Sequence, residues 1–145
     1  MTNSRSNMFE VYKKVKKSGD IEKNPYEIVK LILNELSRSM LNLSNDIERK
    51  KNAIEKKNSE SVLEIQKSIS KHVTRTLTTI YSLQTTLDFE KGGNLANSLF
   101  QLYEYCRLQI IKGFTKSLNQ GILKAKEALD KIISAWDNMS FQENK

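Results

Sequence analysis

The sequence predicts an all-α fold, an antiparallel up-and-down four-helix bundle with a short N-terminal arm or helix. One proline and five glycines in 145 residues leave few breaks in the chain, which suits a helical protein and not a many-stranded β protein. Apolar residues recur at steps of three and four in four separate segments, which is the spacing of a helix face. Because the connections between these segments are short, the up-and-down arrangement is favoured.

The length and composition indicate one domain without a membrane span. A chain of 145 residues can bury roughly 68–70% of its unfolded surface without disulfide or metal support. Hydrophobic residues make up 38% of the chain, and no apolar run approaches the ~20 residues that cross a bilayer. The single cysteine, Cys106, and an N-terminus without an apolar signal favour a cytoplasmic protein.

We divide the chain into an N-terminal arm at 1–23, a bundle domain at 24–139 and a polar tail at 140–145, which we expect to be frayed. The first helix starts at Asn24-Pro25, because Asn can accept hydrogen bonds from free amides and Pro suits the first helical position. It is expected to end within residues 48–59. Its apolar face consists of Val29, Ile32, Leu33, Leu36, Met40, Leu43 and Ile47.

The second helix begins near residues 59–61, and the pair Gly92-Gly93 is predicted to be the turn that follows it. The apolar face of this helix consists of Val62, Ile65, Ile69, Val73, Ile80, Leu83 and Leu87. The third helix follows the glycines and has an apolar sector wider than half its circumference, so we expect it to be the central helix. Residues 115–121 connect it to a fourth helix, whose inward face consists of Ile122, Ala125, Leu129, Ile132 and Trp136.

No catalytic or metal-binding pattern emerges from the sequence. His72 is the only histidine and is expected on a helix surface. Because the single cysteine, Cys106, is far from it in the sequence, we expect neither a zinc cluster nor a Cys–His nucleophile pair. Ser68-Ile69-Ser70-Lys71 matches S-x-x-K but lacks its companion motifs. We therefore predict a protein that is not an enzyme and that uses no cofactor and no metal.

The net charge of +7 favours acidic partners. Basic residues cluster at positions 13–17, 49–51 and 56–57, but acidic residues are interspersed and no recognition motif accompanies the lysines. We therefore interpret these clusters as solvated helix faces and expect no nucleic-acid partner. A basic helical nucleic-acid-binding protein is the alternative.

Several apolar side chains lie off the main helix faces, namely Leu31, Leu41, Leu63, Tyr81 and Leu123. Each can be a singly exposed hydrophobe. Together with the broad face of the third helix they can instead line grooves that receive amphipathic segments of another protein. Both interpretations stay open at this point, as does self-association of a structural subunit.

The segment from Leu87 to Leu99, LDFEKGGNLANSL, is followed by Leu102-Tyr103-Glu104-Tyr105. It resembles the signature L-D-x-x-x-G-G-E-I-A-x-N-L-x-x-L-Y-D-Y of the flagellin-export chaperone family, FliS. The aromatic Tyr12, Pro25 and Ala135-Trp136 agree with that family in order and spacing, so the resemblance covers about residues 8 to 139. Asn94 stands where the family has an acidic residue; either can cap a helix start.

This resemblance implies a cytoplasmic flagellar secretion chaperone with an all-helical fold. It would bind the disordered C-terminal segment of flagellin in apolar grooves, prevent premature polymerisation and aid delivery to the flagellar type III export gate. Phe9 and Tyr12 look like the family's N-terminal apolar pair, and we expect them to occupy the groove in the empty chaperone. A homodimer is left open. The expected partner-binding residues are Phe9, Tyr12, Leu31, Leu41, Leu63, Tyr81, Phe100, Tyr103, Tyr105 and Ile111.

For Leu95, Leu99 and Leu102 on the third helix we favour a position in the core, because they lie on its most central line.

Overall fold

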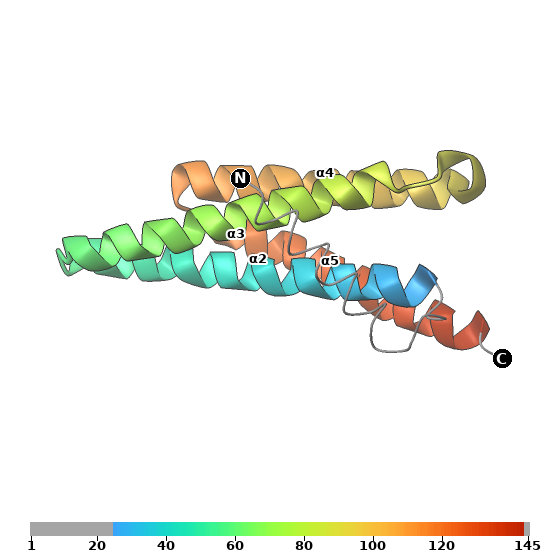
Figure 1. Ribbon diagram of the computed structural model, residues 1–145, viewed down its shortest axis with the longest axis horizontal. Coiled ribbons are helices and arrows are strands. Elements are labelled where there is room, and N and C mark those ends of the chain that lie inside the picture. The colour runs from blue at the N-terminus through green and yellow to red at the C-terminus, as the bar shows by residue number, and fades with distance from the viewer. Residues whose placement is uncertain (1–24, 144–145) are drawn as a thin grey trace.

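The computed structural model describes residues 25–143, which form four helices. They are α2 (Pro25–Glu55), α3 (Ser59–Thr85), α4 (Phe89–Lys116) and α5 (Gln120–Glu143). Successive helices run in opposite directions and are joined by short connections (Figure 1). The predicted all-α, up-and-down bundle is confirmed. Within residues 25–143, no helix combines the length and apolar character that crossing a membrane requires.

The four helices pack in a ring in chain order. α2 packs against α3 and α5, α4 packs against the other sides of α3 and α5, and α2 touches α4 only lightly across the centre. The α2–α3 hairpin extends beyond the α4–α5 connection at the left of Figure 1. The prediction that the third helix is central is not confirmed, because α2 makes the more extensive contacts and part of the wide apolar sector of α4 faces solvent.

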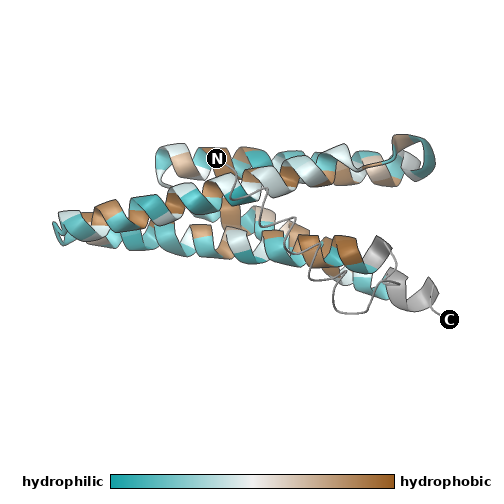
Figure 2. Cartoon of the chain, in the orientation of Figure 1, coloured by the Kyte–Doolittle hydropathy of each residue, from teal (hydrophilic) through white to brown (hydrophobic). Residues whose placement is uncertain are grey.

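The core consists mainly of the side chains that the helical spacing identified. On α2, Leu33, Leu36, Met40 and Leu43 are completely buried, and each such side chain contributes about 1.5–3 kcal/mol relative to exposure. Figure 2 shows hydrophobic and hydrophilic residues interleaved along each helix, as amphipathic helices require. Leu95 differs from the prediction: it is 49% exposed, because it lies near the start of α4 where the helix is covered less.

Asp88 marks the start of α4, and the double glycine does not. Its carboxylate accepts hydrogen bonds from the backbone N–H groups of Glu90 and Lys91 at 3.1 and 3.0 Å, which is the N-cap arrangement. The predicted turn at Gly92-Gly93 is present as a break within the range of α4, because the backbone of Gly93 is not helical. Gly93 adopts φ +50° and ψ −125°, a conformation open to glycine, and kinks α4 there.

The other end of α4 lies against the connection to α5. α4 continues to Lys116, into the stretch that we expected to be a loop. A Cβ atom at Gly113 would lie 2.5 Å from the carbonyl oxygen of Leu118, so glycine permits the connection to fold back directly onto the helix. α5 extends to Glu143, beyond residue 140, where we expected a frayed polar tail.

Candidate functional site

Apolar side chains gather where α3 and α4 lie side by side. On α4, Phe100, Glu104, Ile111 and Phe114 follow one another at helical steps and share one stripe of the helix. Glu104 accepts a hydrogen bond from the side chain of Gln84 on α3, with 3.4 Å between the Gln84 Nε2 and Glu104 Oε2 atoms. The stripe is therefore the side of α4 that is turned toward α3.

The facing side of α3 is apolar as well. Tyr81 lies three residues before Gln84 and Leu77 seven residues before it, so both share the side of α3 that Gln84 turns toward α4. Tyr81 is 67% exposed. We define the α3–α4 face by the residues Leu77, Tyr81, Phe100, Ile111 and Phe114. The structure thus brings together Tyr81, Phe100 and Ile111, which the sequence treated as separate candidates.

Phe89 extends this face toward the α3–α4 connection. Its ring centroid lies 6.0 Å from that of Phe100, with the rings at 61° in an edge-on arrangement, and its side chain is 46% exposed. Sequence reasoning missed Phe89 because it assigned the residue to a turn. A straight helix would hold these two residues about 16 Å apart, so it is the kink at Gly93, between them, that brings Phe89 back to Phe100.

The opposite pair of helices carries a smaller apolar patch. Ser37 on α2 donates a hydrogen bond to Asp130 on α5 at 2.5 Å. Leu41 follows Ser37 by one turn, and Leu123 precedes Asp130 by two turns, so both lie on the α2–α5 side, each 39% exposed. Leu31 is half-buried and lies about 80° around α2 from Leu41, so the structure does not group it with this patch.

Leu63 lies near the projecting end of the α2–α3 hairpin. It precedes Tyr81 by 18 residues, or five helical turns, and therefore lies on the same side of α3. The α2–α3 hairpin extends past the end of α4 (Figure 1), and Leu63 is 60% exposed. Ile54 lies near the end of helix α2 at the same end of the hairpin and is 54% exposed. Sequence reasoning missed it, because its neighbours in sequence are charged.

Tyr103 is not on the surface. Only 1% of the residue is exposed, so we no longer place it among the residues that touch a partner. Burial, together with the nearby Cys106, raises the pKa of Tyr103 to about 12. Burial likewise raises the pKa of the Cys106 thiol to about 12, so the thiol stays protonated and is a poor nucleophile.

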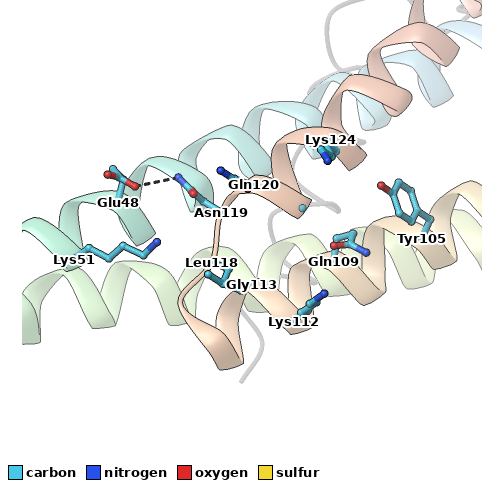
Figure 3. Close-up of a pocket in the computed structure, with 11 residues that line it drawn as sticks. Glu48, Lys51, Tyr105, Gln109, Lys112, Gly113, Leu118, Asn119, Gln120 and Lys124 are labelled. Atoms are coloured by element: carbon cyan, nitrogen blue, oxygen red, sulfur yellow. Dashed lines mark hydrogen bonds between the residues drawn. The ribbon is translucent and has the colours of Figure 1, made fainter.

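Tyr105, which is 40% exposed, lies on the other side of α4 and lines a cavity of about 610 Å³. The cavity lies among the ends of α2, α4 and α5 (Figure 3). Lys51 on α2, Lys112 on α4 and Lys124 on α5 line it together with Tyr105. Helical spacing alone did not reveal this cavity, because its residues come from three segments far apart in the sequence.

The α4–α5 connection is fastened to α2 at this cavity. The side-chain nitrogen of Asn119 donates to the carbonyl oxygen of Ser44 at 3.5 Å and to the carboxylate of Glu48 at 3.4 Å. Figure 3 shows the second of these bonds. Because the connection is held at both α2 and Gly113, the wall of the cavity is part of the folded structure.

A polar cluster lies between α2 and α3. The buried carboxylate of Asp46 accepts hydrogen bonds from Ser68 Oγ at 2.5 Å and from Arg49 at 2.8 Å, and His72 Nε2 lies 3.6 Å away. The His72 side chain is 15% exposed, so the expectation of a helix-surface histidine is corrected. Its Nδ1 atom is buried, and no hydrogen-bond partner for it lies among residues 25–143.

Burial lowers the pKa of His72 below its ordinary value, with smaller contributions in the same direction from Arg75 and Lys71, and the Asp46 carboxylate opposes the shift. At neutral pH the imidazole is therefore uncharged. In residues 25–143 no group of three or more His, Cys, Asp or Glu side chains is placed to hold a metal ion.

Phe9 and Tyr12 of the expected partner-binding set lie outside the described residues. Of the others, Leu41, Leu63, Tyr81 and Tyr105 are exposed, and Leu31, Phe100 and Ile111 are half-buried. Exposed apolar residues that the expected set did not contain are Ile54, Phe89, Leu95, Leu108, Phe114, Leu118 and Leu123. The clear feature of the described surface is thus apolar side chains, concentrated along α4.

Comparisons with known proteins agree with the resemblance noted in the sequence. The family described as Flagellar protein FliS matches residues 8–143. The Flagellar secretion chaperone FliS of Salmonella typhimurium (strain LT2) is 33% identical over 67 residues, which cover 43% of this chain and 50% of that protein. This chain thus aligns with about half the length of that relative. No solved structure matches the chain significantly. Because the family match extends from before α2 to the last residue of α5, this chain belongs to the FliS family of flagellar proteins.

Proposed function

We propose that this chain is a cytoplasmic flagellar secretion chaperone. In this proposal it binds the disordered C-terminal segment of flagellin, prevents premature polymerisation and aids delivery to the flagellar type III export gate. Membership of the FliS family and the name of the Salmonella relative support the chaperone role. The observation that carries the flagellin step is the α3–α4 face, whose apolar side chains are exposed or half-buried. Leu77 packs against the edge of the core, and the other four residues lie outside the core cluster.

The dimensions of this face suit an amphipathic helix. From Phe100 to Phe114, α4 rises about 21 Å at 1.5 Å per residue, which matches a cargo helix of about four turns. Such a helix presents apolar anchors at steps of three and four to a neighbouring apolar surface. A segment that is disordered when free loses entropy on binding, so it needs an extended set of apolar contacts, which this face offers.

Calorimetric titration tests the proposal directly. The probe is a peptide of the last ~40 residues of flagellin from the same organism, the length scale of segments that fold on binding. We expect saturable one-to-one binding with a negative heat-capacity change, because apolar surface is buried. Absence of heat above dilution at micromolar concentrations would contradict the proposal.

Substitution locates the binding face. Tyr81 is 67% exposed, so Tyr81→Ala leaves the core intact, and we expect it to weaken flagellin binding about tenfold, as truncation of an aromatic contact does. The matched control is Leu123→Ala, which truncates an exposed apolar side chain on the α2–α5 side and should leave the affinity unchanged. Equal effects of the two substitutions would argue against the α3–α4 face.

Phe9, Tyr12, the export gate and the oligomeric state belong to the same proposal. We propose that Phe9 and Tyr12 cover the α3–α4 face in the empty chaperone, so deletion of residues 1–18 should lower hydrogen-exchange protection there. Sedimentation of the free chain reports whether it is a monomer or a homodimer. If the face also mediates a dimer, Tyr81→Ala should dissociate it. Binding of the loaded chaperone to a purified export-gate domain tests delivery.

A further inference from the structure

We propose that the cavity among the ends of α2, α4 and α5 is a second docking site, for an acidic polypeptide segment. Lys51, Lys112 and Lys124 converge on it from three different helices (Figure 3). In residues 25–143 none of these three ammonium groups has an ion-pair partner, whereas Lys126, close by on α5, pairs with Asp130 at 2.7 Å. Within the described part of the chain, three ammonium groups thus line one cavity and none of them is paired with a carboxylate.

The local charge balance favours an anionic occupant. Among the residues that the structure describes, Glu48 is the one carboxylate that lines the cavity, and Asn119 already donates a hydrogen bond to it. The first turn of α5 also borders the cavity, so the positive end of its dipole adds to the potential. A concave site lined by an excess of one sign of charge concentrates the field and attracts groups of the opposite sign.

The size and lining of the cavity favour a peptide over a small inorganic anion. Its volume of about 610 Å³ lies within the roughly 300–1,000 Å³ of ligand pockets. Leu118, 46% exposed, and Tyr105, 40% exposed, present apolar surface beside the lysines, and Gln109 offers a carboxamide that can bond peptide groups. A peptide segment with carboxylates next to an apolar side chain could pair with the lysines, pack on Leu118 and Tyr105, and hydrogen-bond to Gln109. Phosphate could pair only with the lysines.

This site is separate from the α3–α4 face. Tyr105 and Ile111 lie about 120° apart around α4, so the helix body stands between the two surfaces and both can be occupied together. The inference does not depend on the proposed binding of flagellin, and its probes are different. A negative result for flagellin binding at the α3–α4 face would therefore not exclude acidic-peptide binding at the cavity, and the reverse also holds.

Nuclear magnetic resonance titration of the full chain, labelled with nitrogen-15, tests the inference with three probes. The first is the acetylated and amidated tetrapeptide Leu-Glu-Glu-Leu, the second is its neutral counterpart Leu-Gln-Gln-Leu, and the third is inorganic phosphate. We expect the acidic peptide to shift the backbone amide signals of Gln109, Lys112 and Gly121, and the effect to weaken with added salt. The neutral peptide and phosphate should produce small shifts or none.

Two triple variants make the test specific. The first combines Lys51→Gln, Lys112→Gln and Lys124→Gln. It should lower the affinity for the acidic peptide about tenfold, as expected for the loss of three partly exposed charges. The control replaces three exposed lysines elsewhere, Lys71→Gln, Lys91→Gln and Lys131→Gln, which changes the net charge equally and should leave the affinity unchanged.

Each remaining outcome would overturn the inference. Equal binding of the neutral peptide would show an apolar site, and binding of phosphate as strong as that of the acidic peptide would show a site for small anions. Equal weakening by the two triple variants would show that only the net charge matters. Absence of shifts with all three probes would show that the cavity is not a docking site.

Discussion

At the scale of single residues, the burial of His72 and its lowered pKa result from packing against the neighbouring helix α2. Its ring packs into the α2–α3 interface, where burial disfavours the imidazolium and Asp46, 3.6 Å away, offsets only part of that effect. Sequence periodicity places His72 beside Val73 on α3 but says nothing about what α2 brings opposite it. The buried Asp46 carboxylate is the unexpected neighbour.

His72 should make the stability of the bundle depend on pH. Because the pKa of His72 is lowered in the folded state, the unfolded chain binds a proton near pH 6.5 while the folded chain stays neutral. The contribution of the neutral His72 to the free energy of unfolding is therefore complete above about pH 6.5 and is lost as the pH falls below that value. Urea unfolding at about pH 7.5 and about pH 5.5 measures the difference in free energy.

The control for this prediction is His72→Gln, which removes the titrating group at the same position. The variant should lose less stability than the parent chain between the two pH values. If both chains lose the same free energy of unfolding, carboxylates and not His72 govern the acid sensitivity.

At the scale of elements, α4 consists of two helical segments joined by a kink at Gly93, because its start and its glycine have separate roles. Asp88 caps the first turn, and Gly93 takes a backbone conformation that other residues rarely adopt. The sequence pattern located both residues but merged their roles into a single turn. As a consequence Phe89 lies in the capped first turn, and the kink at Gly93 brings its ring against that of Phe100.

Gly93→Ala tests the kink, because the kinked and the regular backbone predict opposite changes in the free energy of unfolding. In residues 25–143 the space around a Cβ added at this position is open to 4 Å, so the change introduces backbone strain and no clash. We expect the free energy of unfolding to fall by about 1–3 kcal/mol. In an ordinary helix the same substitution would stabilise by about 1 kcal/mol. Urea unfolding distinguishes the two, and a stabilised variant would contradict the kinked backbone.

The matched control for Gly93 lies one turn further along α4. Asn97 is exposed and helical, so Asn97→Ala should be neutral or slightly stabilising by helix propensity. A loss from Asn97→Ala comparable to that from Gly93→Ala would show that this part of α4 is sensitive to any substitution.

At the scale of the whole molecule, the net charge of +7 should act on binding over distances longer than single contacts. If flagellin supplies acidic groups, its affinity should fall as salt rises from about 0.05 to about 0.5 M, because the Debye length shortens. Calorimetry at the two salt concentrations measures this. An affinity that does not change would show that the α3–α4 face acts through apolar contacts alone.

The cavity among the ends of α2, α4 and α5, which we call the lysine cavity, makes the salt experiment more informative. If the triple variant at Lys51, Lys112 and Lys124 loses the salt dependence of flagellin binding, the acidic part of flagellin occupies the cavity. If the triple variant keeps the full salt dependence, charges elsewhere on the bundle are responsible.

The candidate site was predictable in part. Tyr81 and Leu41 were identified because they lie off the core faces of their own helices, and both are exposed. Tyr103 was misplaced because an apolar sector as wide as that of α4 does not reveal which of its edges is covered. Lys51, Lys112 and Lys124 could not be grouped, because no local pattern connects positions on three helices.

The sequence by itself determined the four helices, their core faces and the all-α class, since helical spacing and caps are local properties of the chain. The tertiary structure alone decided which surfaces those helices form together. Periodicity defines the rotation of each helix about its own axis, but the register between two helices depends on contacts such as Gln84–Glu104 and Ser37–Asp130, between residues 20 and 93 positions apart. The α3–α4 face, the burial of His72 and the lysine cavity all follow from that register.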